Sequence, residues 1–315
     1  MINDFIFMSH FRIKILGCGS ATPTLIHAPS AQIVDLRDKL YLIDCGEGTQ
    51  LQMRRYKVRF NKLNHIFISH AHGDHCFGLP GLISSLGMLG RTGDLIIHGP
   101  VGIETFISPV IAQFCKELPY KVRFNIIDPQ KNELIMEDRS LEVYSIPLKH
   151  RIPTCGFLFS EKPQEPHIIK EMIDFYHVPL KEIADIKQGN DFVAEDGTIV
   201  PHARFTRPAA LPGRYAYCSD TSFAPSIIKY IEGVDCLYHE STFLEKDMHR
   251  AKDTFHSTAR QAAEIASRAG VKLLVLGHYS ARYANLDGFL EEAREVFKNV
   301  VLSVDGEELT VHNEQ

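Results

Sequence analysis

The sequence lacks the features of membrane proteins and of disulfide-rich secreted domains. No stretch of it approaches the roughly 18 consecutive apolar residues that a membrane-spanning helix needs. The seven cysteines are odd in number, scattered and never arranged as Cys-x-x-Cys, which favours free thiols in a reducing compartment. The first residues also lack the basic segment that opens a secretory signal. We therefore expect a cytoplasmic protein with no membrane contact.

An excess of basic residues is also absent. The chain has 34 Lys and Arg against 39 Asp and Glu, a formal net charge of −5. This balance argues against a generally polybasic binder of nucleic acids or membranes, so an anionic substrate must be met by local groups of cations. Residues 54–62 (RRYKVRFNK) hold five basic residues with interleaved aromatics, a pattern that suits a phosphate backbone. The alternative is a solvated helix end. Arg204, Arg207 and Arg214, near Asp220 in sequence, are candidates for the same basic path.

The fold class follows from the alternation of β-prone runs with helical patterns along most of the chain. With 44% apolar residues in 315, the chain can bury a sizeable core. The alternation favours an α/β architecture over separate all-α and all-β parts. A helix is predicted over 48–56. Strands are predicted over 12–16, 31–36, 40–43, 65–69, 95–98, 122–127, 141–147, 155–160, 214–218, 236–238, 273–276 and 300–304.

Several of these predicted strands end in a polar residue that can take part in chemistry. In open α/β sheets, ligand sites gather beyond the carboxyl ends of the strands. We therefore expect one shared cleft at these ends. The residues are Asp44, His70, His150, Asp220, His239 and His278.

The strongest motif is an HxHxDH arrangement formed by His70, His72, Asp74 and His75. Imidazole nitrogens and carboxylate oxygens are ligands that zinc prefers, and four of them within six residues can reach two adjacent sites only from a turn. Gly73 is expected to supply the backbone freedom of that turn. The alternative, a histidine-rich surface loop, is disfavoured because a hydrophobic strand leads directly into the motif.

Residues 161–200 differ from the rest of the chain. They hold four Lys and nine Asp or Glu, which accounts for the whole net charge of −5. We predict that this segment is an inserted, protruding arm. A helix is predicted within it over 167–176.

These motifs resemble the metallo-β-lactamase superfamily and, within it, the ribonuclease Z family of tRNA 3′-processing endonucleases, over nearly the whole chain. The later motifs of that family are matched by His150 in PLKHRIPTCGF, Asp220 in YCSDTS and His278 in LVLGHYSARY. The resemblance implies a single metallo-β-lactamase domain over 1–315, an αββα four-layer sandwich, with 161–200 as an exosite-like arm. It also implies a homodimer that acts on precursor tRNA.

The resemblance assigns the ligands of two zinc ions per subunit, which activate a shared water molecule. One ion would be held by His70, His72 and His150. Asp74, His75 and His278 would hold the other, and Asp220 would bridge both. Asp74 is also placed to orient or deprotonate the water. Asp44, in the family-like stretch IDCGEGTQLQMRRY, is predicted to support the metal loop by hydrogen bonds; a strand-ending Asp in a turn is the alternative.

Two further motifs separate ribonuclease Z from most members of the superfamily, HEST at 239–242 and HST at 256–258. A Glu beside a His orients the imidazolium and raises its proton affinity. The resemblance therefore implies that Glu240 steers His256, which protonates the departing 3′ oxygen. The simpler explanation, a strand end and a helix N-cap at Ser257 or Thr258, is compatible with that role.

The chain departs from the family in two places. Residues 23–30 (PTLIHAPS) stand where many members carry a PxKxRN loop linked with reading the tRNA 3′ end, and they contain neither the Lys nor the Arg-Asn. The arm has no Gly-Pro-rich motif, and its acidic charge opposes contact with phosphates. Two alternatives remain: a hydrolase of small phosphodiesters or esters on the same fold, and a non-enzymatic RNA-binding protein.

Overall fold

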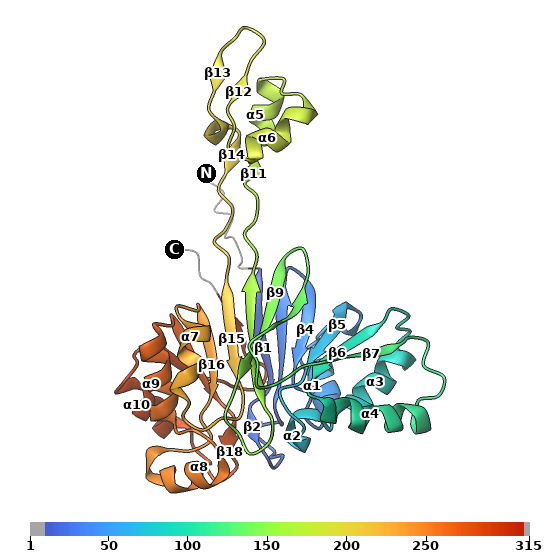
Figure 1. The fold of residues 1–315 in the computed structure, drawn as a ribbon, viewed down its shortest axis with the longest axis vertical. Helices are drawn as coiled ribbons and strands as arrows, with labels where there is room; N and C mark the ends of the chain where they lie inside the picture. Colours follow the sequence, from blue (N-terminus) through green and yellow to red (C-terminus); the bar gives the residue numbers. More distant parts are fainter. Residues whose placement is uncertain (1–9, 312–315) are drawn as a thin grey trace.

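The computed structural model describes residues 10–311. Two seven-stranded sheets lie face to face, and helices cover the outer side of each, so the layers run helix, sheet, sheet, helix (Figure 1). The predicted α/β class and αββα four-layer architecture are confirmed. Within the described range no helix combines the length and apolar character that crossing a bilayer requires. All seven cysteines are free.

The first sheet is built mainly from the N-terminal part of the chain. Its pairs are antiparallel from β20 to β4 and parallel from β4 to β7. On its outer face lie α1 (Thr49–Arg55), α3 (Leu79–Met88) and α4 (Val101–Phe114), which bury one apolar cluster against it. Across the sheet, the strands are β20 (Glu308–Thr310), β1 (Phe11–Gly17), β3 (Ala31–Leu36), β4 (Lys39–Ile43), β5 (Leu63–Phe67), β6 (Leu95–Gly99) and β7 (Val122–Ile126).

The second sheet comes from the C-terminal part. It is parallel from β19 to β15 and antiparallel from β15 to β8. Its outer helices are α7 (Ile228–Ile231), α9 (Ala259–Ala269) and α10 (Asp287–Arg294). Across the sheet, the strands are β19 (Val300–Leu302), β17 (Leu273–Gly277), β16 (Cys236–Glu240), β15 (Arg214–Cys218), β10 (Cys155–Glu161), β9 (Leu141–Pro147) and β8 (Leu134–Glu137).

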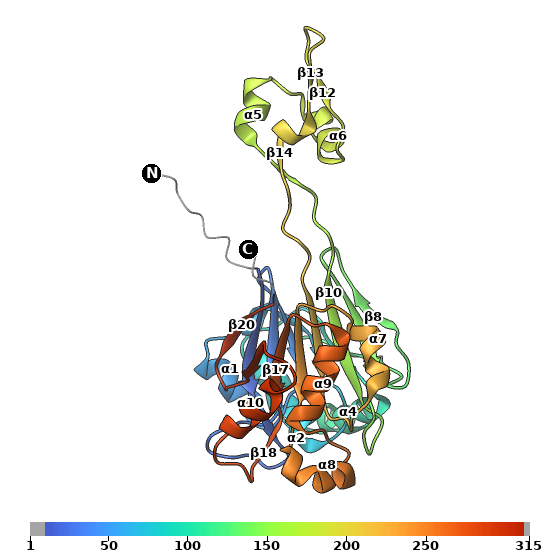
Figure 2. The same ribbon diagram turned by 90° about the vertical axis from the view of Figure 1, so that its left-hand side faces the viewer.

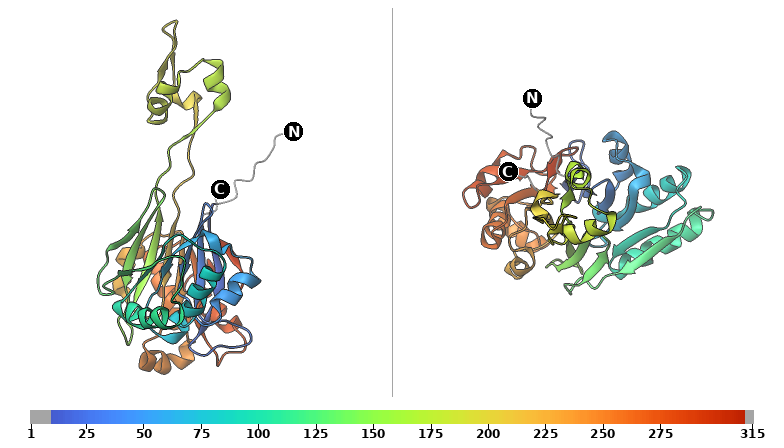
Figure 3. Two further views of the ribbon diagram at one scale, coloured as in Figure 1. Left: turned by 90° about the vertical axis from the view of Figure 1, so that its right-hand side faces the viewer. Right: turned by 90° about the horizontal axis from the view of Figure 1, so that it is seen from above.

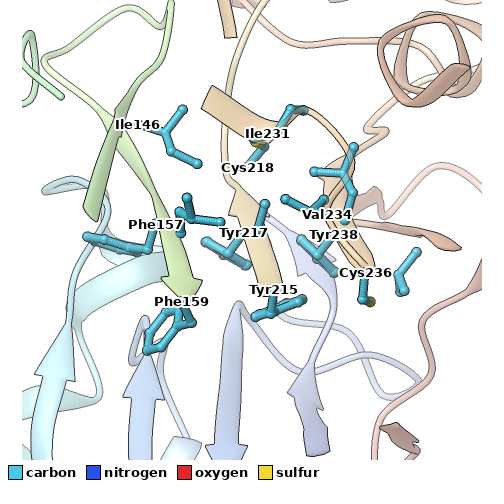
Figure 4. Packing of buried hydrophobic residues seen from close by; sticks show 14 of the residues in the cluster. Ile146, Phe157, Phe159, Tyr215, Tyr217, Cys218, Ile231, Val234, Cys236 and Tyr238 are labelled. Atoms are coloured by element: carbon cyan, nitrogen blue, oxygen red, sulfur yellow. The ribbon is translucent and has the colours of Figure 1, made fainter. Parts of the chain in front are cut away.

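Aromatic side chains fill the space between the two sheets (Figure 4). Phe67 of the first sheet meets Phe157 and Phe159 of the second edge-on, with ring centroids 5.5 and 5.2 Å apart. Tyr217 and Tyr238 stack with centroids 5.0 Å apart. Because large rings contribute much of the buried apolar area, these contacts fix the separation and alignment of the sheets. They thereby fix the strand ends that carry the polar residues.

The carboxyl ends of β9, β15, β16 and β17 lie at one edge of the second sheet, because these strands all run in the same direction. At the same end of the molecule, β2 (Gly19–Ser20) pairs in parallel with β18 (Tyr279–Ser280) and joins the two halves. The short helices α2 (Gly73–Cys76) and α8 (Met248–Thr254) also lie there (Figure 1). The cleft that we predicted beyond the strand ends is therefore expected at this end of the molecule.

An arm leaves the opposite edge of the sandwich, between the end of β10 and the start of β15 (Figures 1 and 2). Figure 3 shows it standing over the middle of the sandwich when seen from above. Five buried residues form its own small core: Val178, Ile186, Phe192, Val200 and Phe205. Its elements are β11 (His167–Ile168), α5 (Lys170–Phe175), α6 (Ile183–Lys187), β12 (Phe192–Val193), β13 (Ile199–Val200) and β14 (Thr206–Arg207).

Two details of the arm differ from the sequence prediction. The helix predicted over 167–176 begins only at Lys170, because His167 and Ile168 pair as a strand with Arg207 and Thr206. The same pairing carries the arm past residue 200, so that it continues to the start of β15 at Arg214. The cause is the long-range ladder, which local helix propensity cannot reveal.

Substituting Phe205→Ala should unfold the arm and leave the sandwich intact. Truncating a buried phenylalanine costs about 3–5 kcal/mol, more than so small a core can absorb. Hydrogen exchange should show lost protection over 167–207, with an unchanged main thermal transition. Phe159→Ala, the same change between the sheets, should instead lower that transition. An equal drop in both variants would mean that the arm does not unfold separately.

Candidate metal centre

The HxHxDH motif follows β5, as predicted: His70 and His72 lie in the loop before α2, and Asp74 and His75 lie in the first turn of α2 itself. His70 and His75 are buried, whereas Asp74 faces the cleft. The role predicted for Gly73 is corrected: its φ is not positive, so no unusual backbone conformation is required. A Cβ at this position would instead lie 2.5 Å from the ring of Phe77. The Phe77 ring is largely exposed and can move aside, so nothing in the structure requires glycine at position 73.

All seven predicted ligand residues converge at this edge of the sandwich. They form two groups in which the candidate ligand atoms lie within 4.8 Å of one another. These groups come from four separate chain segments: one runs from the end of β5 into α2, and the others follow β9, β15 and β17. One group is His70, His72, His150 and Asp220; the other is Asp74, His75 and His278.

Asp220 lies between the two groups and turns one oxygen toward each. Its Oδ2 is 3.5 Å from His70 Nε2 and 3.7 Å from His150 Nε2. Its Oδ1 is 3.3 Å from His75 Nε2 and 3.2 Å from His278 Nε2. A carboxylate in this position can serve two cation sites at once.

The donor set fits divalent metal ions. His150 Nε2 is buried and has no hydrogen-bond partner among the described residues. His70 Nε2 and His72 Nδ1 face each other at 2.9 Å, as do His75 Nε2 and His278 Nε2 at 3.3 Å. Ring nitrogens directed at one another in a buried space suit a shared cation. The site therefore matches the chemistry of a metal centre.

The imidazoles in the pocket differ in their pKa shifts. Burial opposes protonation of His75, but the carboxylates of Asp220, Asp74 and Asp44 outweigh it and raise the pKa of His75. Burial lowers the pKa of His70 and of His150, which keeps these rings neutral as metal ligands must be. Burial opposes ionisation of Asp220, but the neighbouring imidazoles of His278, His75 and His70 outweigh it and hold the pKa of Asp220 well below its usual range. Asp74 is likewise ionised, its pKa lowered by His75 and His278 against the effect of burial. The ionised carboxylates of Asp220 and Asp74 are therefore stabilised by positive charge nearby, which a bound cation would supply.

Asp44 supports the metal loop, as the sequence predicted. Its Oδ2 is 2.7 Å from His75 Nδ1 and accepts hydrogen bonds from the Ser69 hydroxyl at 3.0 Å and the Tyr217 hydroxyl at 2.7 Å. Its Oδ1 accepts from the Ser69 backbone N–H at 2.8 Å. A fixed partner on Nδ1 orients the ring and directs Nε2 toward the pocket. The alternative, that Asp44 only ends a strand in a turn, does not explain why its buried carboxylate makes these contacts.

Glu240 and His256 meet beside the ligand groups. Glu240 Oε1 lies 2.9 Å from His256 Nδ1 and also accepts from the backbone N–H groups of Thr221 and Ser257. Burial opposes the charged imidazolium, but the Glu240 carboxylate outweighs it and raises the pKa of His256 to about 9. The ring is thus held in a proton-carrying form, facing the cleft.

The helix-cap explanation of HST is also confirmed. Thr258 is the N-cap of α9 and forms a capping box with Gln261. This cap fixes the start of α9, two residues after His256, and so contributes to the position of the imidazole.

Sequence reasoning missed several contacts at the centre. The backbone N–H of Ala21 donates to Asp74 Oδ2 at 2.7 Å. Thr242 Oγ1 lies 2.9 Å from His278 Nδ1 and 2.8 Å from Glu240 Oε2. The position of Thr242 within HEST was a usable signal; the Ala21 contact had none, because any residue can supply a backbone N–H.

The cleft in front of the centre has a volume of about 530 Å³. Arg151 is the cation on its wall, directly after the ligand-type His150. Beyond the ligand-type residues and His256, the wall is formed by Ser20, Ala21, Pro23, Pro29, Glu47, Gly73, Phe77, Arg151 and Thr254.

The predicted basic path is not formed at this cleft. Arg204 and Arg207 lie in the arm, and Arg214 opens β15 at the end opposite to Asp220. In the 54–62 stretch, Arg54 and Arg55 occupy the last turn of α1, as the helix-end alternative predicts, and Arg59 pairs with Asp38. Arg214 and Asp220 are close in sequence, but β15 runs between them and places them at opposite ends of the strand.

One family model and several known proteins are similar to this chain. A family model described as "Anti-Pycsar protein Apyc1" matches residues 11–100, less than half of the chain. The ribonuclease Z of Parabacteroides distasonis is 64% identical over 304 residues, 96% of this chain and 100% of that protein. The chain belongs to the ribonuclease Z family. The ribonuclease Z of Porphyromonas gingivalis is 58% identical over 93% of this chain and 97% of its own.

Solved structures agree with membership in the ribonuclease Z family. The short form of human tRNase Z matches with a TM-score of 0.70 and 26% identity, over 96% of this chain and 100% of that one. A metallo-β-lactamase fold protein from Bacillus subtilis, YhfI, matches with a TM-score of 0.65 at 20% identity, which supports the fold. The predicted metallo-β-lactamase fold and family resemblance are confirmed.

Asp44→Asn should weaken metal binding by roughly 10- to 100-fold, because an amide no longer offers an anionic acceptor to His75 Nδ1. Competition with a chromophoric chelator measures the affinity, and circular dichroism checks folding. Asp38→Asn, on the exposed surface, is the control and should leave the affinity unchanged. Equal affinities for Asp44→Asn and the unaltered chain would contradict the role assigned to Asp44.

Proposed function

We propose that this chain is a metal-dependent endoribonuclease that removes 3′ trailers from precursor tRNA, leaving a 3′-hydroxyl on the tRNA and a 5′-phosphate on the trailer. The observation that carries the proposal is the convergence of six ligand-type side chains around the seventh, Asp220, in a chain that is 64% identical to a ribonuclease Z along its length. The Glu240–His256 pair beside that centre favours this function over hydrolysis of small esters.

Two zinc ions are the proposed cofactor, supported by the nitrogen and oxygen donors and by their division into two groups. One ion would be held by His70, His72 and His150, and the other by Asp74, His75 and His278, with Asp220 serving both. When bound, the ions would supply positive charge to the phosphoryl oxygens and lower the pKa of a water molecule that attacks phosphorus.

Asp74 is proposed to orient or deprotonate the attacking water. Its carboxylate lines the cleft, and the Ala21 N–H fixes its Oδ2 at 2.7 Å. Its lowered pKa keeps it ionised and able to accept a hydrogen bond from water. A carboxylate held at one atom is preorganised for this task.

His256 is proposed to donate its proton to the departing 3′ oxygen, and Glu240 to position the ring. The His256 imidazole lies beside both ligand groups. Its ring centroid is 5.1 Å from the ring centroid of His150 and 5.4 Å from that of His278. Its Nδ1 faces Glu240, so Nε2 is the nitrogen that remains to face the substrate. Proton donation prevents an alkoxide from forming on the leaving group.

We propose that residues 1–315 act as one domain and that the arm serves as an exosite in a homodimer. The arm and the cleft lie at opposite ends of the sandwich (Figure 1), so an arm is poorly placed to serve the cleft of its own chain. A partner copy would bring an arm to each cleft. Free thiols at all seven cysteines support a cytoplasmic location.

The decisive experiment offers the purified protein a trailer-bearing precursor tRNA and a simple phosphodiester, with and without a chelator. We expect endonucleolytic cleavage of the precursor that stops with the chelator and returns with zinc. Asp220→Asn should abolish cleavage while the protein remains folded. Cleavage of the simple ester alone would favour the small-molecule hydrolase.

His256→Ala should lower kcat on precursor tRNA by roughly 10²- to 10⁴-fold, since the 3′ oxygen then leaves without its proton. The loss should be much smaller on bis(p-nitrophenyl) phosphate, whose leaving group needs no acid. His249→Ala, on exposed α8, is the control. Equal losses on both substrates would assign His256 a purely structural role.

A further inference from the structure

A second cluster of metal-ligand side chains lies outside the centre described above. Cys18 follows β1, His27 lies in the loop after β2, and Asp305 lies between β19 and β20. Cys18 Sγ is 3.4 Å from His27 Nδ1 and 3.3 Å from Asp305 Oδ1, and these last two atoms are 3.8 Å apart. None of the three is among the seven ligand-type residues of the cleft.

The hydrogen-bonding capacity of the thiol does not account for this arrangement. Cys18 Sγ also lies 3.5 Å from the Ser303 carbonyl oxygen. A thiol carries one proton, yet Sγ has a carboxylate and a carbonyl oxygen, both acceptors only, beside it. The 3.8 Å between His27 Nδ1 and Asp305 Oδ1 is too long for a direct hydrogen bond.

A metal ion accounts for the same distances. With bonds of about 2.3 Å to sulfur and roughly 2.0–2.1 Å to nitrogen and oxygen, two ligands of a tetrahedral zinc ion lie roughly 3.3–3.6 Å apart. The two separations that involve sulfur, 3.4 and 3.3 Å, are near these edges. The 3.8 Å between His27 Nδ1 and Asp305 Oδ1 exceeds them, so the two atoms would move closer together on binding the ion. A thiolate ligand favours zinc over magnesium or calcium.

We propose that Cys18, His27 and Asp305 bind a further zinc ion, separate from the metal centre in the cleft, with water in the fourth position. Asp305 is already held for this role. Its Oδ2 accepts from the Ala28 backbone N–H at 2.7 Å and from Gln52 Nε2 at 3.1 Å, which leaves Oδ1 directed at the other two ligands. Such outer contacts orient a metal-binding carboxylate.

The site would tie the loop over residues 21–29 to the C-terminal part of the chain. This loop forms part of the cleft wall through Pro23 and Pro29, and its first residue, Ala21, donates to Asp74. Zinc at Cys18, His27 and Asp305 would therefore stiffen the wall beside the centre. Its role is structural, so it does not depend on the identity of the substrate.

Cobalt substitution gives a selective test, because among the candidate metal groups of residues 10–311 only this one includes a sulfur ligand. The protein is stripped of metal and reloaded with Co²⁺. We expect a near-ultraviolet sulfur-to-cobalt charge-transfer band that Cys18→Ser removes, together with one equivalent of bound metal. Cys115→Ser, at a partly exposed cysteine outside the cluster, should keep both.

A second variant covers the case in which Cys18→Ser, a change in the core, fails to fold. His27 is partly exposed, so His27→Gln removes a ligand without altering the core. It should lose the same equivalent of metal and expose 21–29 to faster hydrogen exchange. The band should persist in Asp220→Asn, which separates this proposal from the proposed function. Absence of the band in the unaltered protein, with equal metal content in His27→Gln, would overturn the proposal.

Discussion

The structure depends on one electrostatic constraint, the burial of the Asp220 carboxylate among imidazoles. An ionised carboxylate out of water needs compensating charge and directed contacts. Asp220 finds them by turning one oxygen to each of two ligand groups. Positive charge at both groups satisfies the carboxylate and neutralises the site, so the binding of cations and the stability of this edge are linked.

The hydrophobic core and the metal centre are connected through Tyr217. Its ring stacks on Tyr238 in the space between the sheets, and its hydroxyl reaches Asp44, which in turn holds His75. Packing between the sheets therefore orients a ligand-type side chain that is far away in sequence. A change in the aromatic layer is expected to be felt at the centre, because protein cores transmit small displacements.

Most of the site could be predicted from the sequence because four of the seven ligand-type residues follow a short apolar strand and the other three belong to the same HxHxDH motif as one of them. His70, His150, Asp220 and His278 are all of this kind, and their strands bring them to one edge. The arm boundary and the place of Arg204 and Arg207 could not be predicted in this way. Both depend on the pairing of β11 with β14, a ladder between residues some 40 positions apart in the sequence that leaves no local pattern. Hydrogen bonds from backbone N–H groups, such as that of Ala21, also leave no local pattern in the sequence.

The pairing of β20 with β1 has a consequence for the synthesis of the protein. β1 is made before β20, its neighbour at the sheet edge, and about 300 residues separate the two strands in the sequence. Until β20 arrives, β1 presents an open row of N–H and C=O groups on which other chains can pair. Chains that have made β1 but not yet β20 are thus the forms most exposed to aggregation, and pairing with β20 removes that hazard.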